Sequence, residues 1–442
     1  MIPQRGPSLL RKPSSRYSLL IFAFISASAA FGENRPDSLH SSEPIIRISL
    51  TDNVREFTLA VHGRFSLKYQ YFTIAEISDT AMSFTFSPNG VAVATLPNQK
   101  LRFSFPMKLE PADSSRGQLK NGIRYSNQSG SAKSGQTFPG SLEIFPQKDG
   151  TFQIINLVPL ETYLRGVVPN ELVNNLTPDE FQACMAQAIA ARNFAFFKMD
   201  KQDSANFDVY SDTRDQVYSG VERYKSIADS AINLTSGMIV EYHGQPARCF
   251  FHSACGGHTE SVQNIWQGQP ALPYLQGVSD MDSATGDPYC IYSQNFFWSR
   301  SYPANQINSL VKENLAFANP MYTNRTPPGT ITDMRILDRF DSFRVDSLAI
   351  TAENGDVYYV RGDRARYLFK NSDGTPLRSS LFRITVSRNS QGRLEQVVLK
   401  GQGTGHGVGM CQWGSIGMSK LGFSYLQILS HYFPGTEVKK VY

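Results

Sequence analysis

Five glycines alternate with other residues from Gly401 to Gly409, within the stretch GQGTGHGVGMCQWGS. Such a run removes side chains from both faces of an extended segment, which permits positive φ angles or a close approach to the backbone. The spacing does not match the G-x-G-x-x-G fingerprint, and no Lys-Ser or Lys-Thr pair follows, so a phosphate-binding loop is excluded. The stretch is therefore either a glycine-rich turn or bulge in a sheet, or a bare surface that another molecule approaches.

The N-terminus has the pattern of an export signal. Basic residues precede a short apolar run at 19–25, and Ala27 and Ala29 occupy the two small-residue places of an A-x-A cleavage site. The apolar run is too short to span a bilayer comfortably. We therefore expect residues 1–29 to be a signal peptide and the mature chain to work outside the cytoplasm, in the periplasm or cell envelope; an uncleaved anchor is the alternative.

The net charge of +5 is concentrated in that signal. Its four basic residues leave 5 − 4 = +1 for the rest of the chain, because no acidic residue lies in the first 29 positions. A nearly neutral body argues against a nucleic-acid partner. The five cysteines are an odd number, so at least one is unpaired within the chain, and an exported location permits disulfides among the others.

The pattern of short apolar segments predicts an α+β fold. Residues 30–44 are polar and predict a linker, whereas residues 45–110 alternate in the manner of strands. Residues 140–158 predict a hairpin that turns at Lys148-Asp149-Gly150. We expect a largely antiparallel β body, an alanine-rich helix packed in it, and one substrate groove.

Two helices are predicted, and the first has a clear start signal. Thr177-Pro178-Asp179-Glu180 supplies an N-cap, a proline at the first helical place and an acid three residues after the cap. The alanine-rich stretch that follows is suited to close packing against another backbone. The final stretch SYLQILSHYF predicts a second helix.

Glu171 precedes the alanine-rich helix, and Pro169 and Asn170 are expected to hold it at a turn. Its apolar neighbours, such as Val168 and Leu172, would shield the carboxyl from water and raise its pKa. A carboxyl of this kind would hold a proton near neutrality. The alternative is a solvated surface glutamate near a helix start.

A series of motifs runs from about residue 45 to the end. In chain order they are PLETYLRGVVPNEL, AQAIAARNFA, SDTRDQVYSG, FHSACGGHTE, LPYLQGV, LRSSLF and GHGVGMCQWGSIGMSKLGFSYLQILSHYFPGTEV. Together they resemble the SpoIID/LytB domain family. The resemblance implies one domain over 45–442, with a β-rich part at 45–155 and a catalytic core at 156–442. Within this core, residues 300–376 match poorly and are expected to be a variable region.

The resemblance implies a peptidoglycan lytic transglycosylase that acts on denuded glycan strands and requires no cofactor. Glu171 matches the family's catalytic acid and would serve as both acid and base, since the 6-hydroxyl of muramic acid supplies the nucleophile. This chemistry explains a single carboxylate where most glycosidases need two. The alternative function is a non-catalytic peptidoglycan-binding module that enhances an N-acetylmuramoyl-L-alanine amidase.

Several polar and aromatic residues are candidates for substrate binding. We expect the bare backbone at 401–409 to form the floor of a sugar groove, with Trp413 stacking on a sugar face and Arg192 holding an acidic or N-acetyl group. Trp413 is as plausibly a core tryptophan, and Arg192 an ordinary helix-end arginine. The full candidate set is Arg192, His252, Ser253, His406, Gln412 and Trp413. Two positions depart from the family pattern, since Met185 occupies a lysine place and Cys411 a serine place.

A metal site is also a candidate. His252, Cys255 and His258 are spaced by three residues, and Cys290 follows in DPYC, so two His and two Cys would make a closed tetrahedral zinc site. Alternatively, His252 contacts substrate or Glu171, and Cys255 and Cys290 form a disulfide. In either case we expect Cys255 and Cys290 to lie close in space.

Overall fold

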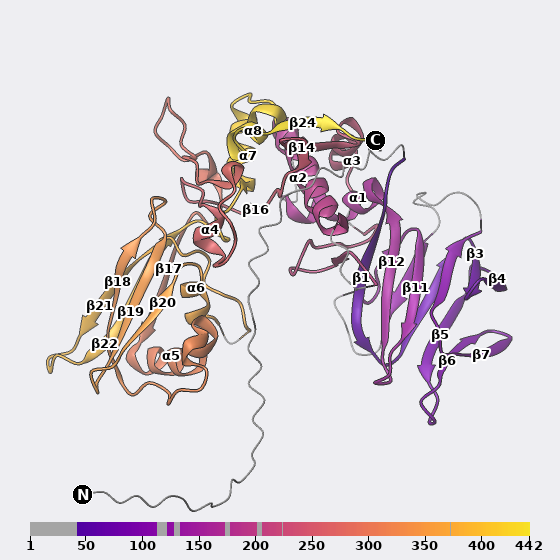
Figure 1. Cartoon of the computed structure of the whole chain (residues 1–442), viewed down its shortest axis with the longest axis horizontal. Coiled ribbons are helices and arrows are strands. Elements are labelled where there is room, and N and C mark those ends of the chain that lie inside the picture. The colour runs from indigo at the N-terminus through magenta and orange to yellow at the C-terminus, as the bar shows by residue number, and fades with distance from the viewer. Residues whose placement is uncertain are drawn as a thin grey trace, which may run out of the picture. The chain divides into compact units, whose positions relative to one another are not determined.

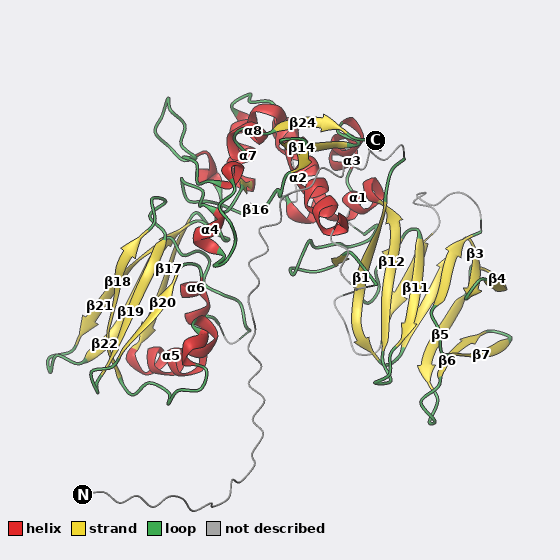
Figure 2. Cartoon of the chain, viewed as in Figure 1, coloured by secondary structure: helices red, strands yellow, loops and turns green. Residues whose placement is uncertain are grey.

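The computed structural model describes residues 42–112, 122–127, 133–172, 177–200, 206–222, 224–371 and 373–442. The expected signal peptide and residues 30–41 of the expected linker lie outside these ranges. In the described residues the fold is mixed α and β, with most strands in antiparallel sheets and several helices (Figures 1 and 2). None of the described helices is both long and apolar enough to cross a membrane.

Two sheets make up the N-terminal part. The first runs in the order β13 (Val209–Tyr210), β1 (Ile45–Val54), β12 (Phe152–Pro159), β11 (Ser141–Pro146), β8 (Met107–Pro111), β3 (Arg64–Tyr69), β4 (Phe72–Ser78). The second runs β10 (Thr137–Phe138), β9 (Gly122–Ser126), β2 (Phe57–His62), β5 (Ala81–Phe86), β6 (Ala92–Leu96), β7 (Gln99–Phe103). Neighbouring strands are antiparallel, except that β1 pairs with β13 in parallel.

The predicted hairpin at 140–158 is confirmed. β11 pairs antiparallel with β12, with Ser141 opposite Leu157, and Gly150 turns the chain with a φ of +77° that favours glycine. Both strands bury alternate apolar residues because one face of the sheet covers a core.

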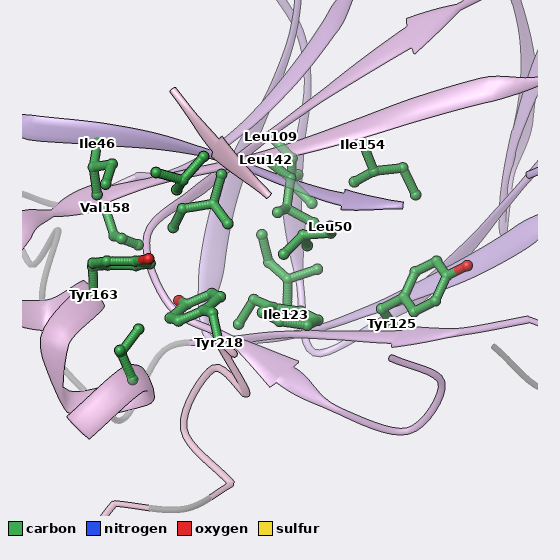
Figure 3. Close-up of a cluster of buried hydrophobic side chains, with 14 of the residues drawn as sticks. Ile46, Leu50, Leu109, Ile123, Tyr125, Leu142, Ile154, Val158, Tyr163 and Tyr218 are labelled. Atoms are coloured by element: carbon green, nitrogen blue, oxygen red, sulfur yellow. The ribbon is translucent and has the colours of Figure 1, made fainter. Parts of the chain in front are cut away.

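That core joins the two sheets and continues into the helices. Phe57 of the second sheet meets Phe152 of the first edge to face, with ring centroids 5.3 Å apart. Figure 3 shows the side of the core where Ile46 and Val158 lie near the buried rings of Tyr163 and Tyr218. Tyr163 belongs to α1 (Leu160–Glu171), which starts directly where β12 ends, so the sheet fixes the start of this helix.

The alanine-rich helix lies between two hydrophobic clusters. A capping box between Thr177 and Glu180 is present as predicted, and it opens a 3₁₀ turn (Pro178–Glu180) that continues into α2 (Phe181–Asp200). Ala188 and Ala191 pack into the same cluster as the N-terminal sheets, whereas Ala190 faces a second cluster. The hydrophobic residues of α2 are thus buried on more than one side, which suits a row of small residues.

The second cluster gathers elements from distant parts of the chain. They are β14 (Met238–Tyr242) with its partner β15 (Gln245–Pro246), β16 (Phe251–His252), α4 (Val262–Ile265), the 3₁₀ turns Pro273–Leu275 and Tyr289–Tyr292, β23 (Met410–Cys411), α7 (Gln412–Lys420), α8 (Tyr425–Tyr432) and β24 (Glu437–Lys440). The helix α3 (Ser226–Leu234) instead packs into the first cluster, against α1 and α2. The predicted final helix corresponds to α8, which Ser424 and Gln427 cap reciprocally.

A third hydrophobic cluster lies between Trp298 and Leu399. One three-stranded sheet of this cluster runs β17 (Phe297–Pro303), β22 (Leu394–Gln402), β21 (Phe382–Arg388), and the other runs β18 (Ile331–Arg339), β19 (Val345–Ala352), β20 (Val357–Arg361). The helices are α5 (Ala304–Ala318) and α6 (Arg364–Leu368), and a 3₁₀ turn (Pro320–Tyr322) follows α5. The region 300–376, which matches the family motifs poorly, therefore contributes to a core of its own.

Candidate functional site

Glu171 is the last residue of α1, and two segments hold its carboxyl group. One carboxylate oxygen accepts a hydrogen bond from the backbone N–H of Val217 at 3.3 Å, and the other from the side-chain amide of Gln412 at 3.5 Å. The expectation that Pro169 and Asn170 form a turn before Glu171 is wrong, because both residues are helical. Asn170 instead donates to the carbonyl oxygens of Gly166 and Val217, which ties the helix end to the Val217 segment.

Burial raises the pKa of Glu171 above the usual value for a glutamic acid, and its two hydrogen bonds partly offset the shift. This direction agrees with the expectation from the apolar neighbours. Among the described residues no second carboxylate contributes to the shift. Desolvation therefore favours the protonated form of Glu171.

Arg192, which we expected to contact substrate, is a core residue that anchors the other end of α1. Its guanidinium is fully buried and makes two parallel hydrogen bonds to Glu161, at 2.9 and 2.7 Å. Glu161 also accepts from the Gly237 N–H at 3.1 Å and the Tyr442 hydroxyl at 2.5 Å. These contacts join α1 and α2 to the C-terminus, and they leave Arg192 no exposed surface for a ligand.

The glycine run does not form a bare floor for a sugar, because it is packed against the protein itself. A Cβ on Gly405 would lie 2.8 Å from Cβ of His252, and one on Gly407 would lie 2.6 Å from the guanidinium of Arg344. A Cβ on Gly409 would overlap the carbonyl oxygen of Phe250. The glycines therefore allow close contact with the segment around β16, which pairs in parallel with β23.

This contact brings two candidate histidines together. The rings of His252 and His406 have centroids 5.5 Å apart, and His406 lies 4.9 Å from the Trp266 ring. Nδ1 of His406 accepts from the Val408 N–H, and Nδ1 of His252 contacts the Val408 carbonyl as a donor. Burial lowers the pKa of both imidazoles, that of His406 to about 3, so both are neutral at neutral pH. Nε2 of His252 has no partner among the described residues.

The first turn of α7 supplies the remaining candidates. Gln412 reaches Glu171, and the backbone N–H of Trp413 donates to the Ser253 carbonyl oxygen at 3.0 Å. The Trp413 ring is partly buried and packs against the first and second hydrophobic clusters. The structure therefore links Glu171, Gln412, Trp413 and Ser253 in one chain of contacts, and their roles toward a substrate stay predictions. Met185, in the family's lysine place, is buried in the first cluster.

Of the four expected metal ligands, the structure brings the two cysteines together but not the two histidines. Cys255 and Cys290 are close, as predicted, with sulfur atoms 3.6 Å apart. Neither histidine joins them. His252 contacts the Val408 carbonyl instead, and the chain turns at Gly256 and Gly257, both with positive φ, before His258, whose ring contacts the Thr259 carbonyl. Within the described residues the group that converges on the two cysteines consists of Asp280 and Cys411.

The sequence did not single out Val217, although it lies in the motif SDTRDQVYSG, nor Asp280, which lies in no such motif. Cys411 was marked only as a departure from the family pattern.

A hollow of about 1280 Å³ lies between the 256–258 segment and the strands β17 and β22. Its lining includes Phe297, Phe343 and Arg383 but not Glu171, so the expected groove at Glu171 stays a prediction.

Comparison with known proteins gives two family matches. A family model described as stage II sporulation protein, SpoIID, matches residues 148–242, the region that contains Glu171 and Val217. A second model, a domain of unknown function, matches residues 290–409 and so covers the third hydrophobic cluster.

Three curated relatives are similar over much of the chain. An uncharacterized protein of Brachyspira hyodysenteriae is 28% identical, over 90% of this chain and 94% of the relative. The stage II sporulation protein D of Bacillus subtilis is 25% identical, over 70% of this chain and 82% of the relative. The amidase enhancer of the same organism is 25% identical over 62% of this chain, a match that spans only 40% of that relative.

Proposed function

We propose that this chain, a member of the SpoIID/LytB family, is an exported lytic transglycosylase that remodels peptidoglycan. Its substrate is denuded glycan, cleaved between muramic acid and glucosamine to leave 1,6-anhydro-muramic ends. The apolar run and A-x-A site within residues 1–29 support export.

The observation that carries this proposal is the raised pKa of the Glu171 carboxyl group. Its carboxyl group has a pKa raised by burial, and no charged group among the described residues contributes to that shift. A general acid needs a proton at the working pH, and desolvation favours the protonated form. A two-carboxylate hydrolase would need a second acidic group to activate water or to attack the sugar.

One carboxyl group is sufficient for an intramolecular reaction. Glu171 donates its proton to the glycosidic oxygen as the bond from that oxygen to C1 of muramic acid breaks. The resulting carboxylate then takes the proton of the 6-hydroxyl while the 6-oxygen bonds to C1. The proton returns to Glu171, no water is consumed, and the product is the 1,6-anhydro sugar.

The partners of Glu171 suit both stages of this cycle. The N–H of Val217 and the amide of Gln412 each stabilise the carboxylate that forms after proton donation. They also fix the direction of the carboxyl group. Ser253, His406 and Trp413, on the elements that carry or adjoin Gln412, are proposed to contact the sugar.

Product analysis tests the proposal. The full exported chain is incubated with denuded glycan strands, and the new chain ends are identified by mass spectrometry. Anhydro-muramic ends support lytic transglycosylation. Ordinary reducing ends would mean hydrolysis, which needs a second carboxylate. A chain that binds glycan without forming new ends would contradict the enzymatic proposal.

The alternative function is a non-catalytic enhancer of a peptidoglycan amidase. One observation favours it, namely that a relative 25% identical to this chain carries the name amidase enhancer. The same incubation distinguishes the two, since an enhancer would accelerate stem-peptide removal by an added amidase while leaving glycan length unchanged.

A further inference from the structure

Four buried side chains converge from four separate segments. Cys255 follows β16, Asp280 and Cys290 lie on either side of the 282–287 turn, and Cys411 ends β23. All four are fully buried, and one potential ligand atom from each lies within 4.8 Å of the other three. The Cys255 sulfur lies 3.6 Å from that of Cys290 and 2.9 Å from an Asp280 oxygen.

The donor set has the composition of a structural zinc site. Zn²⁺ in such sites takes four ligands in a tetrahedron, and thiolates dominate the set. With Zn–S bonds of about 2.3 Å, neighbouring sulfurs of a tetrahedron lie about 3.8 Å apart. The observed sulfur separation of 3.6 Å for Cys255 and Cys290 is close to that value. Three sulfurs and one carboxylate oxygen complete the four positions.

The surroundings of two of the three sulfur atoms suit charged thiolates. Backbone N–H groups point at two of the sulfurs, from Cys255 and Gly414 to Cys411 and from Gly257 to Cys255, each at 3.2 Å. Such N–H groups would stabilise negative charge on these two sulfurs. A Cβ on Gly414 would lie 2.6 Å from Asp280, so only glycine leaves room for that carboxylate.

Two further side chains lie beside the Asp280 carboxylate. The hydroxyl of Tyr432 donates to Asp280 at 2.5 Å, and Nε2 of His431 lies 3.7 Å from the same oxygen. Metal-bound carboxylates are commonly oriented by hydrogen bonds of this kind. They would leave the other oxygen of Asp280, the one near Cys255, for the metal.

Charge balance supports a divalent cation at this place. Three thiolates and one carboxylate carry four negative charges, which cannot be buried without compensation. A zinc ion supplies two positive charges. Arg344, fully buried, supplies a third, and its guanidinium donates to the carbonyl oxygens of Cys255 and His258.

From this geometry we propose that Cys255, Asp280, Cys290 and Cys411 bind a structural Zn²⁺ ion. The ion cross-links β16, the 280–290 loop and the start of α7. Since Cys411 is the N-cap of α7 and Gln412 is its first residue, the ion also fixes the helix that carries Gln412 to Glu171. The metal takes no part in the glycosidic chemistry.

The first test is the metal content of the full chain, purified without chelator and under reducing conditions. We expect about one zinc per chain by elemental analysis, as for a closed four-ligand site. Cobalt substitution gives a readout independent of any variant, since tetrahedral thiolate-bound Co²⁺ has intense visible bands and a thiolate-to-cobalt charge-transfer band. Protein that takes up neither zinc nor cobalt, or holds a different metal at these residues, overturns the proposal.

Variants assign the ligands. Cys411→Ser and Asp280→Asn are expected to lose the zinc, whereas Cys249→Ser and Cys184→Ser retain it, since these two cysteines are equally buried but lie outside the group. Tyr432→Phe keeps all four ligands and is expected to weaken zinc binding by about 10- to 100-fold, the usual effect of removing an outer hydrogen bond. Zinc retained at full affinity in both ligand variants would contradict the assignment.

A disulfide is the competing arrangement for an exported protein. Thiol titration of the unfolded chain, with peptide mapping, distinguishes it. We expect all five cysteines to react as thiols once zinc is removed. A disulfide between Cys255 and Cys290 in the protein as isolated from its exported location overturns the zinc proposal.

Discussion

The side-chain amide of Gln412 lies 3.5 Å from the Glu171 carboxylate, although 241 residues separate them in the sequence. The contact joins the end of α1 to the first turn of α7, two elements that meet through α2. It means that the proton affinity of the proposed acid depends on a helix at the far end of the chain.

The first prediction concerns pH. Burial raises the pKa of Glu171, so the acid stays protonated to a higher pH than an exposed glutamic acid would. The rate of glycan cleavage is expected to fall as pH rises through that raised pKa. The alkaline limb of kcat/KM against pH measures it. An alkaline limb at the pKa of an ordinary exposed glutamate would contradict the proposed desolvation.

Replacing Gln412 by Met tests the contact itself. The hydrogen bond from Gln412 lowers the pKa of Glu171, because it stabilises the carboxylate. Gln412→Met is therefore expected to raise that pKa further and to move the alkaline limb to higher pH. Gln306→Met, on the exposed face of α5, is the matched control and should leave the limb in place. A limb that moves to lower pH, or does not move, would refute the assigned role.

Local features of the fold were predictable from the sequence, and long-range ones were not. The capping box at Thr177 and the hairpin turn at Gly150 depend on neighbours within a few residues, and both occur as expected. The direction of the Glu171 pKa shift also followed from adjacent apolar residues. Its partners Val217 and Gln412 did not, since only tertiary packing brings them to the carboxyl group.

The metal ligands illustrate the same limit. Regular spacing of His252, Cys255 and His258 suggested a shared site, but positive φ at Gly256 and Gly257 turns the chain between the last two. The residues that do converge have irregular spacing and come from separate segments. The role of Arg192 was missed for a related reason, because its partner Glu161 belongs to another helix.

The buried ion pair of Arg192 and Glu161, which joins α2 to α1, leads to a prediction about stability. Arg192→Met leaves the carboxylate of Glu161 without its main partner in the protein interior. Breaking a buried pair from one side typically costs about 3–5 kcal/mol, and we expect that loss in the free energy of unfolding. Urea denaturation measures it, with the exposed Arg335→Met as the control. A loss no greater than in the control would show that the pair contributes little.

The glycine run gives a matched comparison of packing and backbone strain. Gly409 and Gly392 have nearly equal positive φ, +72° and +73°, but a Cβ meets the Phe250 carbonyl at Gly409 and open space at Gly392. Both alanine variants pay the strain of positive φ, about 1–2 kcal/mol. Gly409→Ala is expected to lose about 1–3 kcal/mol more through overpacking. Equal losses in thermal or urea unfolding would mean that the run tolerates side chains.

The last prediction concerns Glu171 itself. Glu171→Gln keeps the size of the side chain and an oxygen that can accept from Val217, but the amide cannot protonate the leaving oxygen. General acid catalysis alone contributes about 100- to 10,000-fold, and here the same residue would also act as the base. The loss in cleavage rate is therefore expected at the upper end of that range or beyond it.

Glycan affinity should change little in the same variant, because the lost interaction arises in the transition state rather than on binding. The measurement pairs the count of anhydro-muramic ends with a binding isotherm on denuded strands. Glu313→Gln, an exposed glutamate of α5, is the control for the change of charge and should cleave as the wild type does. Cleavage by Glu171→Gln at the wild-type rate would remove Glu171 from the mechanism. A parallel loss of binding would instead give the residue a role in holding the ground-state glycan.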